Sequence, residues 1–258
     1  MKLLEVLLHL VSLMLCLSCS VKEDRDACPC RLVLDMNGVD TSVVRHAELV
    51  VSTSDGFSYR DTLGIDDFAR DYIVDIPRGI VGVGAYFGAD GCVSENGWLE
   101  IEYGQECPPV YMYSSLVEAY GEKVEEAVVL KKNHCLMTIH VQAEEGFPFR
   151  LSVKGAVNGY EPGGRPSEGE FMYSAGVDFD SVCQVAVPRQ IDNSLRLEVS
   201  DGSDILKSFA LGEYMHASGY DWHEPDLKDV MLNLDYSRTR ISISVAGWNE
   251  EHVFDVII

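Results

Sequence analysis

Basic residues are scarce in this 258-residue chain, which has 20 lysines and arginines against 42 aspartates and glutamates. The formal net charge is −22 at pH 7. Nucleic acids and anionic membrane surfaces repel such an acidic protein, because like charges raise the free energy of approach. The composition therefore argues against a polyanion-binding protein and favours a soluble body that stands away from a bilayer.

Catalytic motifs are absent as well. The chain has no G-x-S-x-G, no H-E-x-x-H and no phosphate-binding loop. His216, Asp221 and His223 lie close together in a polar and aromatic stretch that we predict to be a loop, but their spacing matches no catalytic arrangement. We therefore expect no enzyme, no catalytic residue, no cofactor and no small-molecule substrate.

The cysteines do not have zinc-finger spacing. Cys28-Pro-Cys30 and His134-Cys135 are the sharpest metal-ligand candidates, yet neither pair has the C-x2-C or H-x3-H spacing that wraps a tetrahedral zinc ion. We expect no metal site. Buried thiols or disulfides are the better interpretation for the six cysteines beyond the N-terminal region, although the sequence cannot choose a pairing: Cys28, Cys30, Cys92, Cys107, Cys135 and Cys183.

The N-terminus has the pattern of an export leader. Lys2 supplies a basic start, and residues 6–17 form a largely apolar core that is too short to span a bilayer. No later stretch is long and apolar enough to be a transmembrane helix. We therefore expect residues 1–18 to be a signal peptide that is removed.

Cys19 is the predicted lipidation site. Ser18 before it, with leucines close upstream, resembles the lipobox at which bacterial signal peptidases cut between Ser18 and Cys19. The alternative is an ordinary secretory leader in which Cys19 is buried or disulfide-bonded. Each methylene of the attached lipid that enters a membrane contributes about 0.8 kcal/mol. Residues 19–30 would then be a lipidated tether, and the charged residues 22–24 resemble a signal for display on the outer face of the outer membrane.

The remaining sequence predicts an all-β protein. Short runs with period-two alternation recur between Asp-Gly and Pro-Gly turn signals, as a sheet with one buried face requires. Residues 116–129 break this pattern and predict either one exposed helix or an ordered loop, which we take as the junction. Two tandem β-sandwich domains, residues 31–129 and 130–258, are the simplest architecture.

Several segments, in order, carry a family resemblance. They are Cys19-Ser-Val-Lys-Glu-Asp-Arg25, Cys28-Pro-Cys-Arg-Leu-Val-Leu34, Asp71-Tyr-Ile-Val-Asp-Ile-Pro-Arg-Gly79, Gly84-Ala-Tyr-Phe-Gly88, Leu130-Lys-Lys132 and Ile241-Ser-Ile-Ser-Val-Ala-Gly-Trp248. As an ordered set they resemble the FimB-like anchor lipoproteins of Bacteroidota fimbriae, within the fimbrillin superfamily. The resemblance spans nearly the whole mature chain.

The resemblance implies two transthyretin-like β-sandwiches and a minor fimbrial subunit. Such a subunit holds the fibre to the outer membrane through its lipid, can limit fibre length, and joins a fimbrillin stalk subunit by strand exchange. Stalk subunits lose an N-terminal segment to an arginine-specific protease, whereas an anchor keeps its lipid, so Arg25 and Arg31 should stay uncut. A stalk or tip subunit is the nearest alternative.

The C-terminal strand is the candidate for strand exchange, because β-augmentation needs an apolar strand with free main-chain groups. An ordinary edge or core strand of the second domain is the competing interpretation. The partner-binding residues we predict are Val253, Phe254, Val256, Ile257 and Ile258.

A surface lipoprotein that binds a glycan or host protein is the other alternative. Two sets of aromatic residues could form its platform, although scattered aromatics belong more often to a core. The two sets are Tyr111, Tyr113 and Tyr120, and Tyr214, Tyr220 and Trp222.

Overall fold

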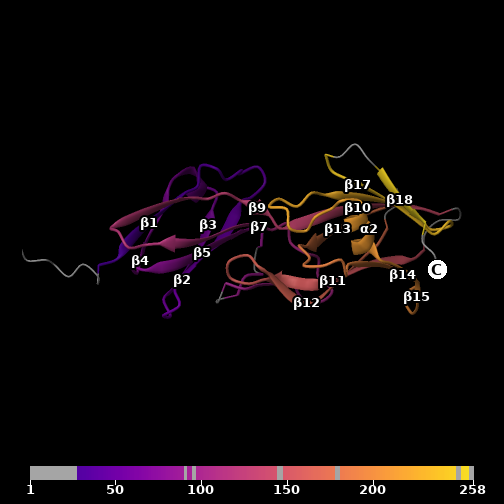
Figure 1. The fold of residues 1–258 in the computed structure, drawn as a ribbon, viewed down its shortest axis with the longest axis horizontal. Helices are drawn as coiled ribbons and strands as arrows, with labels where there is room; N and C mark the ends of the chain where they lie inside the picture. Colours follow the sequence, from indigo (N-terminus) through magenta and orange to yellow (C-terminus); the bar gives the residue numbers. More distant parts are fainter. Residues whose placement is uncertain are drawn as a thin grey trace, which may run out of the picture.

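The computed structural model describes residues 28–89, 92–94, 97–143, 148–177, 181–247 and 251–255. These residues form an elongated, almost entirely β molecule in which two lobes follow one another along the long axis (Figure 1). The prediction of an all-β fold is confirmed. Ser18 and Cys19, with their predicted cleavage and lipidation, lie outside the described residues, as do Val256, Ile257 and Ile258.

The first lobe is a sandwich of two sheets. The smaller sheet has the order β4 (Tyr72–Ile76), β1 (Cys30–Asp35), β8 (Lys123–Ala127). The larger has the order β3 (Ser58–Gly64), β2 (His46–Ser52), β5 (Ile80–Phe87), β7 (Tyr111–Glu118), β9 (Lys131–Lys132), and a 3-10 turn, η1 (Asp67–Ala69), follows β3.

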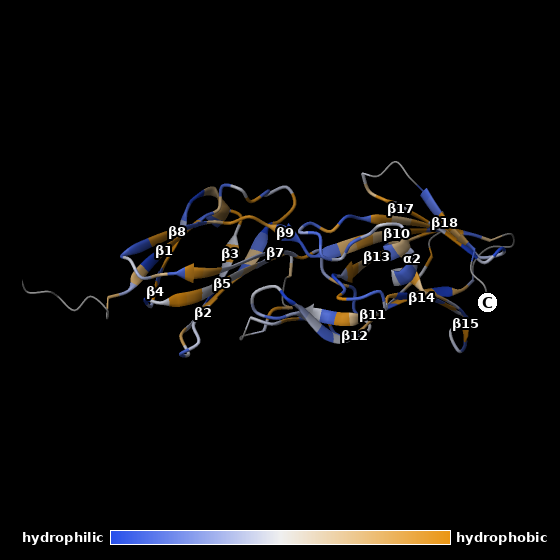
Figure 2. Ribbon diagram, in the orientation of Figure 1, coloured by the Kyte–Doolittle hydropathy of each residue, from blue (hydrophilic) through white to orange (hydrophobic). Residues whose placement is uncertain are grey.

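Alternation along β5 shows why these residues form a sandwich. Val81, Val83 and Phe87 are buried in the core of the first lobe, whereas Gly82 and Gly84 lie on the other face of the sheet. β2 and β5 are largely apolar along their length (Figure 2). Leu32 and Val74 of the smaller sheet belong to the same core, so the smaller sheet covers this apolar face.

The second lobe also has two sheets. One has the order β13 (Val182–Pro188), β10 (His134–Gln142), β16 (Val230–Asp235), β17 (Arg240–Val245), β18 (Glu251–Asp255). The other has the order β12 (Pro166–Ala175), β11 (Arg150–Tyr160), β14 (Arg196–Ser200), β15 (Ile205–Phe209), and β6 (Leu99–Glu100) also pairs with β11. One short helix, α2 (Leu211–Ala217), follows β15.

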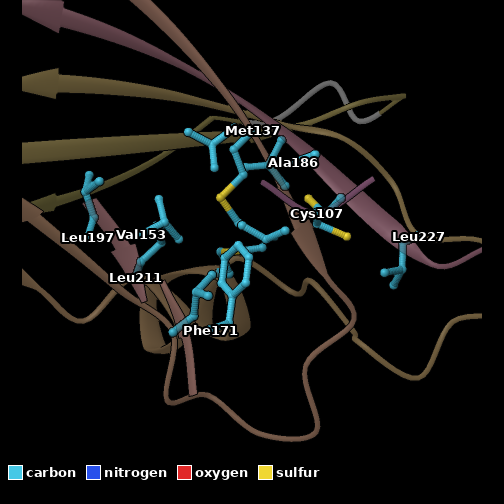
Figure 3. Packing of buried hydrophobic residues seen from close by; sticks show 14 of the residues in the cluster. Cys107, Met137, Val153, Phe171, Ala186, Leu197, Leu211 and Leu227 are labelled. Carbon is cyan, nitrogen blue, oxygen red and sulfur yellow. The ribbon is translucent and has the colours of Figure 1, made fainter. Parts of the chain in front are cut away.

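The connection between β5 and β7 belongs to the core of the second lobe. Leu99, Ile101 and Cys107 from this connection are buried together with residues of β10, β11 and β13. Figure 3 shows Cys107 in the same packed group as Met137, Phe171 and Ala186. The two lobes are therefore interleaved in sequence, and the predicted division between residues 129 and 130 stays a prediction.

Two local predictions are wrong. Residues 116–129 are neither a helix nor one loop, because β7 runs through Glu118 and β8 occupies Lys123–Ala127. The helical face that the spacing indicated does not form, and Leu116 and Tyr120 are exposed. The polar stretch around His216 is not only a loop either, since α2 covers Leu211–Ala217 and buries Leu211 and Met215.

Candidate functional site

β1 is the first described strand and lies inside its sheet. It pairs with β4 on one side and with β8 on the other, so that Leu32 lies opposite both Val74 and Val124. Cys30, Leu32 and Leu34 have no exposed surface. The smaller sheet of the first lobe is therefore complete within one chain, with β1 as its central strand.

Arg31 lies on this strand with its side chain outward. Its guanidinium is 3.8 Å from Asp75, and both side chains are largely exposed. Its backbone N–H donates to the carbonyl of Glu122 at 2.9 Å. The main chain at Arg31 is thus held in the sheet, although the side chain is accessible.

The entry to β1 is tied to the next loop. The Nε of Arg78 donates to the carbonyl of Cys28 at 3.0 Å, and an Nη of Arg78 donates to the carbonyl of Tyr120. The chain therefore enters the first lobe beside the turn before β5. This entry lies at the end of the molecule far from the second lobe (Figure 1).

β18 lies at the opposite end of the molecule (Figure 1) and is an edge strand. It pairs antiparallel with β17, so that Val253 lies opposite Ser242 and Phe254 opposite Ile241. The Phe254 ring stacks on Tyr214 with centroids 4.9 Å apart, whereas 56% of Val253 is exposed. Phe254 thus belongs to the lobe, and Val253 is the described apolar residue of this strand that a partner could contact.

A hydrogen-bond node joins the start of β10 to the loop after α2. Arg189 donates through Nε to the Asn133 side-chain oxygen at 2.9 Å and through its Nη atoms to four backbone carbonyls. Those carbonyls belong to Lys132, Trp222, Glu224 and Pro225. The Tyr160 hydroxyl donates to the Asn133 carbonyl and accepts the Arg189 N–H. No spacing in the sequence indicated this node.

The aromatic sets do not form the platforms that a glycan-binding protein would need. Tyr220 and Trp222 are buried and meet edge to face with centroids 4.9 Å apart. Tyr113 is buried in the first lobe, and one face of the Tyr214 ring is covered by the ring of Phe254, which stacks on it. Of these residues only Tyr120 is largely exposed, so no flat aromatic surface results.

The metal and catalytic candidates stay apart. Cys28 and Cys30 begin the first lobe, whereas His134 and Cys135 begin β10 in the second. Within the described ranges, no three His, Cys, Asp or Glu residues are grouped to hold a metal ion. Asp221 and His223 form an exposed pair 2.9 Å apart. That no enzyme is present remains an expectation.

The thiols of Cys107, Cys135 and Cys183 are buried in the second lobe. Burial raises the pKa of Cys135 to about 12 and holds the pKa of Cys107 well above its usual value. Since the thiolate is the nucleophile and the metal ligand, neither thiol is activated for chemistry at neutral pH. Burial also lowers the pKa of His134, whose Nδ1 lies 3.1 Å from the Val110 carbonyl.

None of the described helices is long and apolar enough to cross a membrane.

No protein-family model matches the chain, and no curated protein matches it. Solved structures do match it over almost their whole length.

The fimbrial anchor protein Mfa2 from Porphyromonas gingivalis is 12% identical with a TM-score of 0.61, over 86% of this chain and 98% of that one. A candidate adhesin from Bacteroides ovatus is 13% identical with a TM-score of 0.59, over 91% of this chain and 97% of that one. Candidate polysaccharide-binding proteins from Bacteroides thetaiotaomicron are 14% identical with a TM-score of 0.60, over 88% of this chain and 98% of theirs. The chain therefore has the fold of the fimbrial anchor and of these adhesin-like proteins, and the resemblance to fimbrillin-type proteins is confirmed at the level of the fold.

Proposed function

We propose that this protein is a minor fimbrial subunit at the cell surface, which anchors a fimbrial fibre to the outer membrane through a lipid on Cys19 and can limit the length of the fibre. The observation that carries the proposal is the separation of the two ends: the chain enters one end of the molecule at Cys28, and β18 lies at the other. A link under tension needs its membrane end and its fibre end far apart. The shared fold with an anchor protein is consistent with this role.

The place of β1 supports an N-terminal strand that stays uncut, as the anchor role requires. A stalk subunit has to lose its first strand before another chain can fill the gap. Here β1 is held on both sides, and the main chain at Arg31 is bonded into the sheet. A protease needs an extended, unpaired substrate, so cleavage after Arg31 would require prior unfolding of the first lobe.

The anchoring role is tested by replacing Cys19 with alanine. We expect the variant to lose its acyl chains, because alanine has no sulfur on which the thioether can form. Without the lipid, almost all fibres should be released into the medium. Mass spectrometry of the mature N-terminus from membranes and a count of attached fibres measure the two effects. Cys28→Ala is the matched control, because it removes an exposed cysteine outside the lipobox. Unchanged fibre attachment in the Cys19 variant would reject the role.

We propose that the stalk subunit docks on the outer edge of β18, the side away from β17, where main-chain N–H and C=O groups supply affinity and side chains supply specificity. In strand exchange, β18 would leave its own sheet and complete the sheet of another subunit. Because β18 pairs with β17, we propose instead that β18 stays in its own sheet and that the stalk subunit adds a strand beside it. Val256, Ile257 and Ile258 lie outside the described residues and remain predicted partner contacts.

Val253→Asp tests this docking site. We expect binding to purified stalk fimbrillin to weaken about tenfold, because a central apolar contact contributes on the order of 1–2 kcal/mol. Biolayer interferometry with the folded variant measures the effect. Ile205→Asp is the control, since Ile205 lies on the edge strand β15 and is 58% exposed, close to the 56% of Val253. Equal loss in both variants would argue against a site at β18.

A further inference from the structure

An apolar pocket of about 350 Å³ lies where the two lobes meet, away from β18. The β1–β2 connection supplies Val43 and Val44, and the β8–β9 connection supplies Val128 and Val129. In each pair one valine is buried and the other is exposed, by 52% for Val43 and 66% for Val129. The pocket is at the lower end of the roughly 300–1,000 Å³ that is typical of ligand sites.

Hydrogen bonds hold the walls of this pocket in place. The Val128 N–H donates to the Asp35 carbonyl at 2.9 Å, which ties the β8–β9 connection to the end of β1. The Val44 N–H donates to the Asp40 carbonyl at 3.1 Å, which closes a turn in the other wall. An occupant therefore meets a preformed surface and does not have to order it, which lowers the cost of binding.

Two carboxylates lie in the lining of the pocket. Asp40 accepts hydrogen bonds from the backbone N–H and the hydroxyl of Ser42, which lowers its pKa and keeps it ionised. Asp226, from the second lobe, accepts the Lys132 N–H at 2.9 Å. Among the described residues neither carboxylate has a salt-bridge partner, and the Lys132 ammonium is engaged by Asp229. The pocket is thus apolar with negative charge in its lining: Asp40 forms no ion pair with a described residue, whereas the charge of Asp226 is partly balanced by the Arg189 guanidinium.

This chemistry selects one kind of occupant. A second copy of the chain, with a net charge of −22, and an anionic lipid surface would both be repelled. Exposed valines beside the carboxylates of Asp40 and Asp226 fit an aliphatic side chain that has a cation next to it. We propose that the pocket docks an extended segment of another protein in which leucine-like side chains are flanked by lysine or arginine.

The probe for this proposal is a fluorescein-labelled peptide, Gly-Lys-Leu-Leu-Lys-Gly, added to the full mature protein. We expect saturable binding in fluorescence polarisation that weakens as salt is raised, because the carboxylate contribution is screened. The matched peptides Gly-Glu-Leu-Leu-Glu-Gly and Gly-Lys-Ser-Ser-Lys-Gly should bind at least about tenfold more weakly, since each lacks one of the two required features.

Variants locate the binding. Val129→Asp should weaken binding about tenfold or more, because it places a charge where the aliphatic side chain would be desolvated. Asp40→Asn and Asp226→Asn retain the hydrogen-bond acceptors and should each weaken binding about twofold to fivefold. Ile73→Asp is the control, because Ile73 lies in the first lobe, is 56% exposed and does not line the pocket.

Equal binding by the parent protein and Val129→Asp, or equal binding of the lysine and glutamate peptides, would overturn the proposal. Self-association of the protein that disappears in Val129→Asp would also overturn it, because the occupant would then be a second copy. Thermal melting of each variant verifies that the lobes remain folded. The outcome is independent of the fimbrial role, since Val253→Asp should leave peptide binding unchanged.

Discussion

Leu32→Asp is expected to unfold the first lobe. Leu32 has no exposed surface and lies between Val74 of β4 and Val124 of β8. An ionised carboxylate in that position would lie among the apolar side chains of the first lobe's core, and such a buried charge costs more than about 5 kcal/mol. That cost equals much of the stability of an ordinary domain, which is about 5–15 kcal/mol.

Hydrogen exchange followed by mass spectrometry measures this effect. Protection should be lost first in β1, β4 and β8, and an arginine-specific protease should then cut after Arg31. Arg31→Ala is the neighbouring control, because its exposed ion pair with Asp75 contributes no more than about 1 kcal/mol. Parent-like protection in Leu32→Asp would mean that β1 is not a core strand and that the argument for an uncut anchor is wrong.

Arg189→Ala is expected to destabilise the protein by about 3–5 kcal/mol, because removing the guanidinium takes the donor away from two part-buried acceptors, the Trp222 carbonyl and the Asn133 side-chain oxygen, whereas the Lys132 carbonyl keeps the Leu227 N–H. The corresponding fall in melting temperature is about 10 °C for a chain of this size. Arg189→Lys should recover part of the loss, since an ammonium keeps the charge but lacks the planar fork of donors.

Arg238→Ala is the matched control for the node. The Arg238 side chain is 75% exposed and lies 3.6 Å from Asp235, so its removal should change stability by less than about 1 kcal/mol. Urea unfolding of the three variants and the parent measures the difference. A loss in Arg189→Ala no larger than in Arg238→Ala would contradict a structural role for the node.

The strands were predictable wherever one face of a sheet is buried and the other is exposed to solvent. β10 and β16 show this pattern, with alternating buried and more exposed residues along their length. Prediction failed at residues 116–129, where Leu116, Tyr120 and Val124 have helical spacing but β7 and β8 pair with strands far away in sequence. Long-range pairing overrode the local pattern there.

The candidate sites were predictable to different degrees. The apolar C-terminal strand was visible in the sequence, but only its pairing with β17 and the stacking of Phe254 on Tyr214 distinguish the inward residue from the outward one. The pocket between the lobes was not visible. Its carboxylates, Asp40 and Asp226, are 186 positions apart and meet only because the lobes dock.

The sequence by itself determined the all-β class, because period-two alternation between turn residues can bury an apolar face only in a sheet. It also carries the expectation of a lipid on Cys19, since leader and lipobox are linear patterns. Only the tertiary structure decided that the β5–β7 connection packs into the second lobe, that β1 is a central strand and that Arg189 joins the start of β10 to the loop after α2. Those features depend on contacts between residues distant in sequence, which no local pattern encodes.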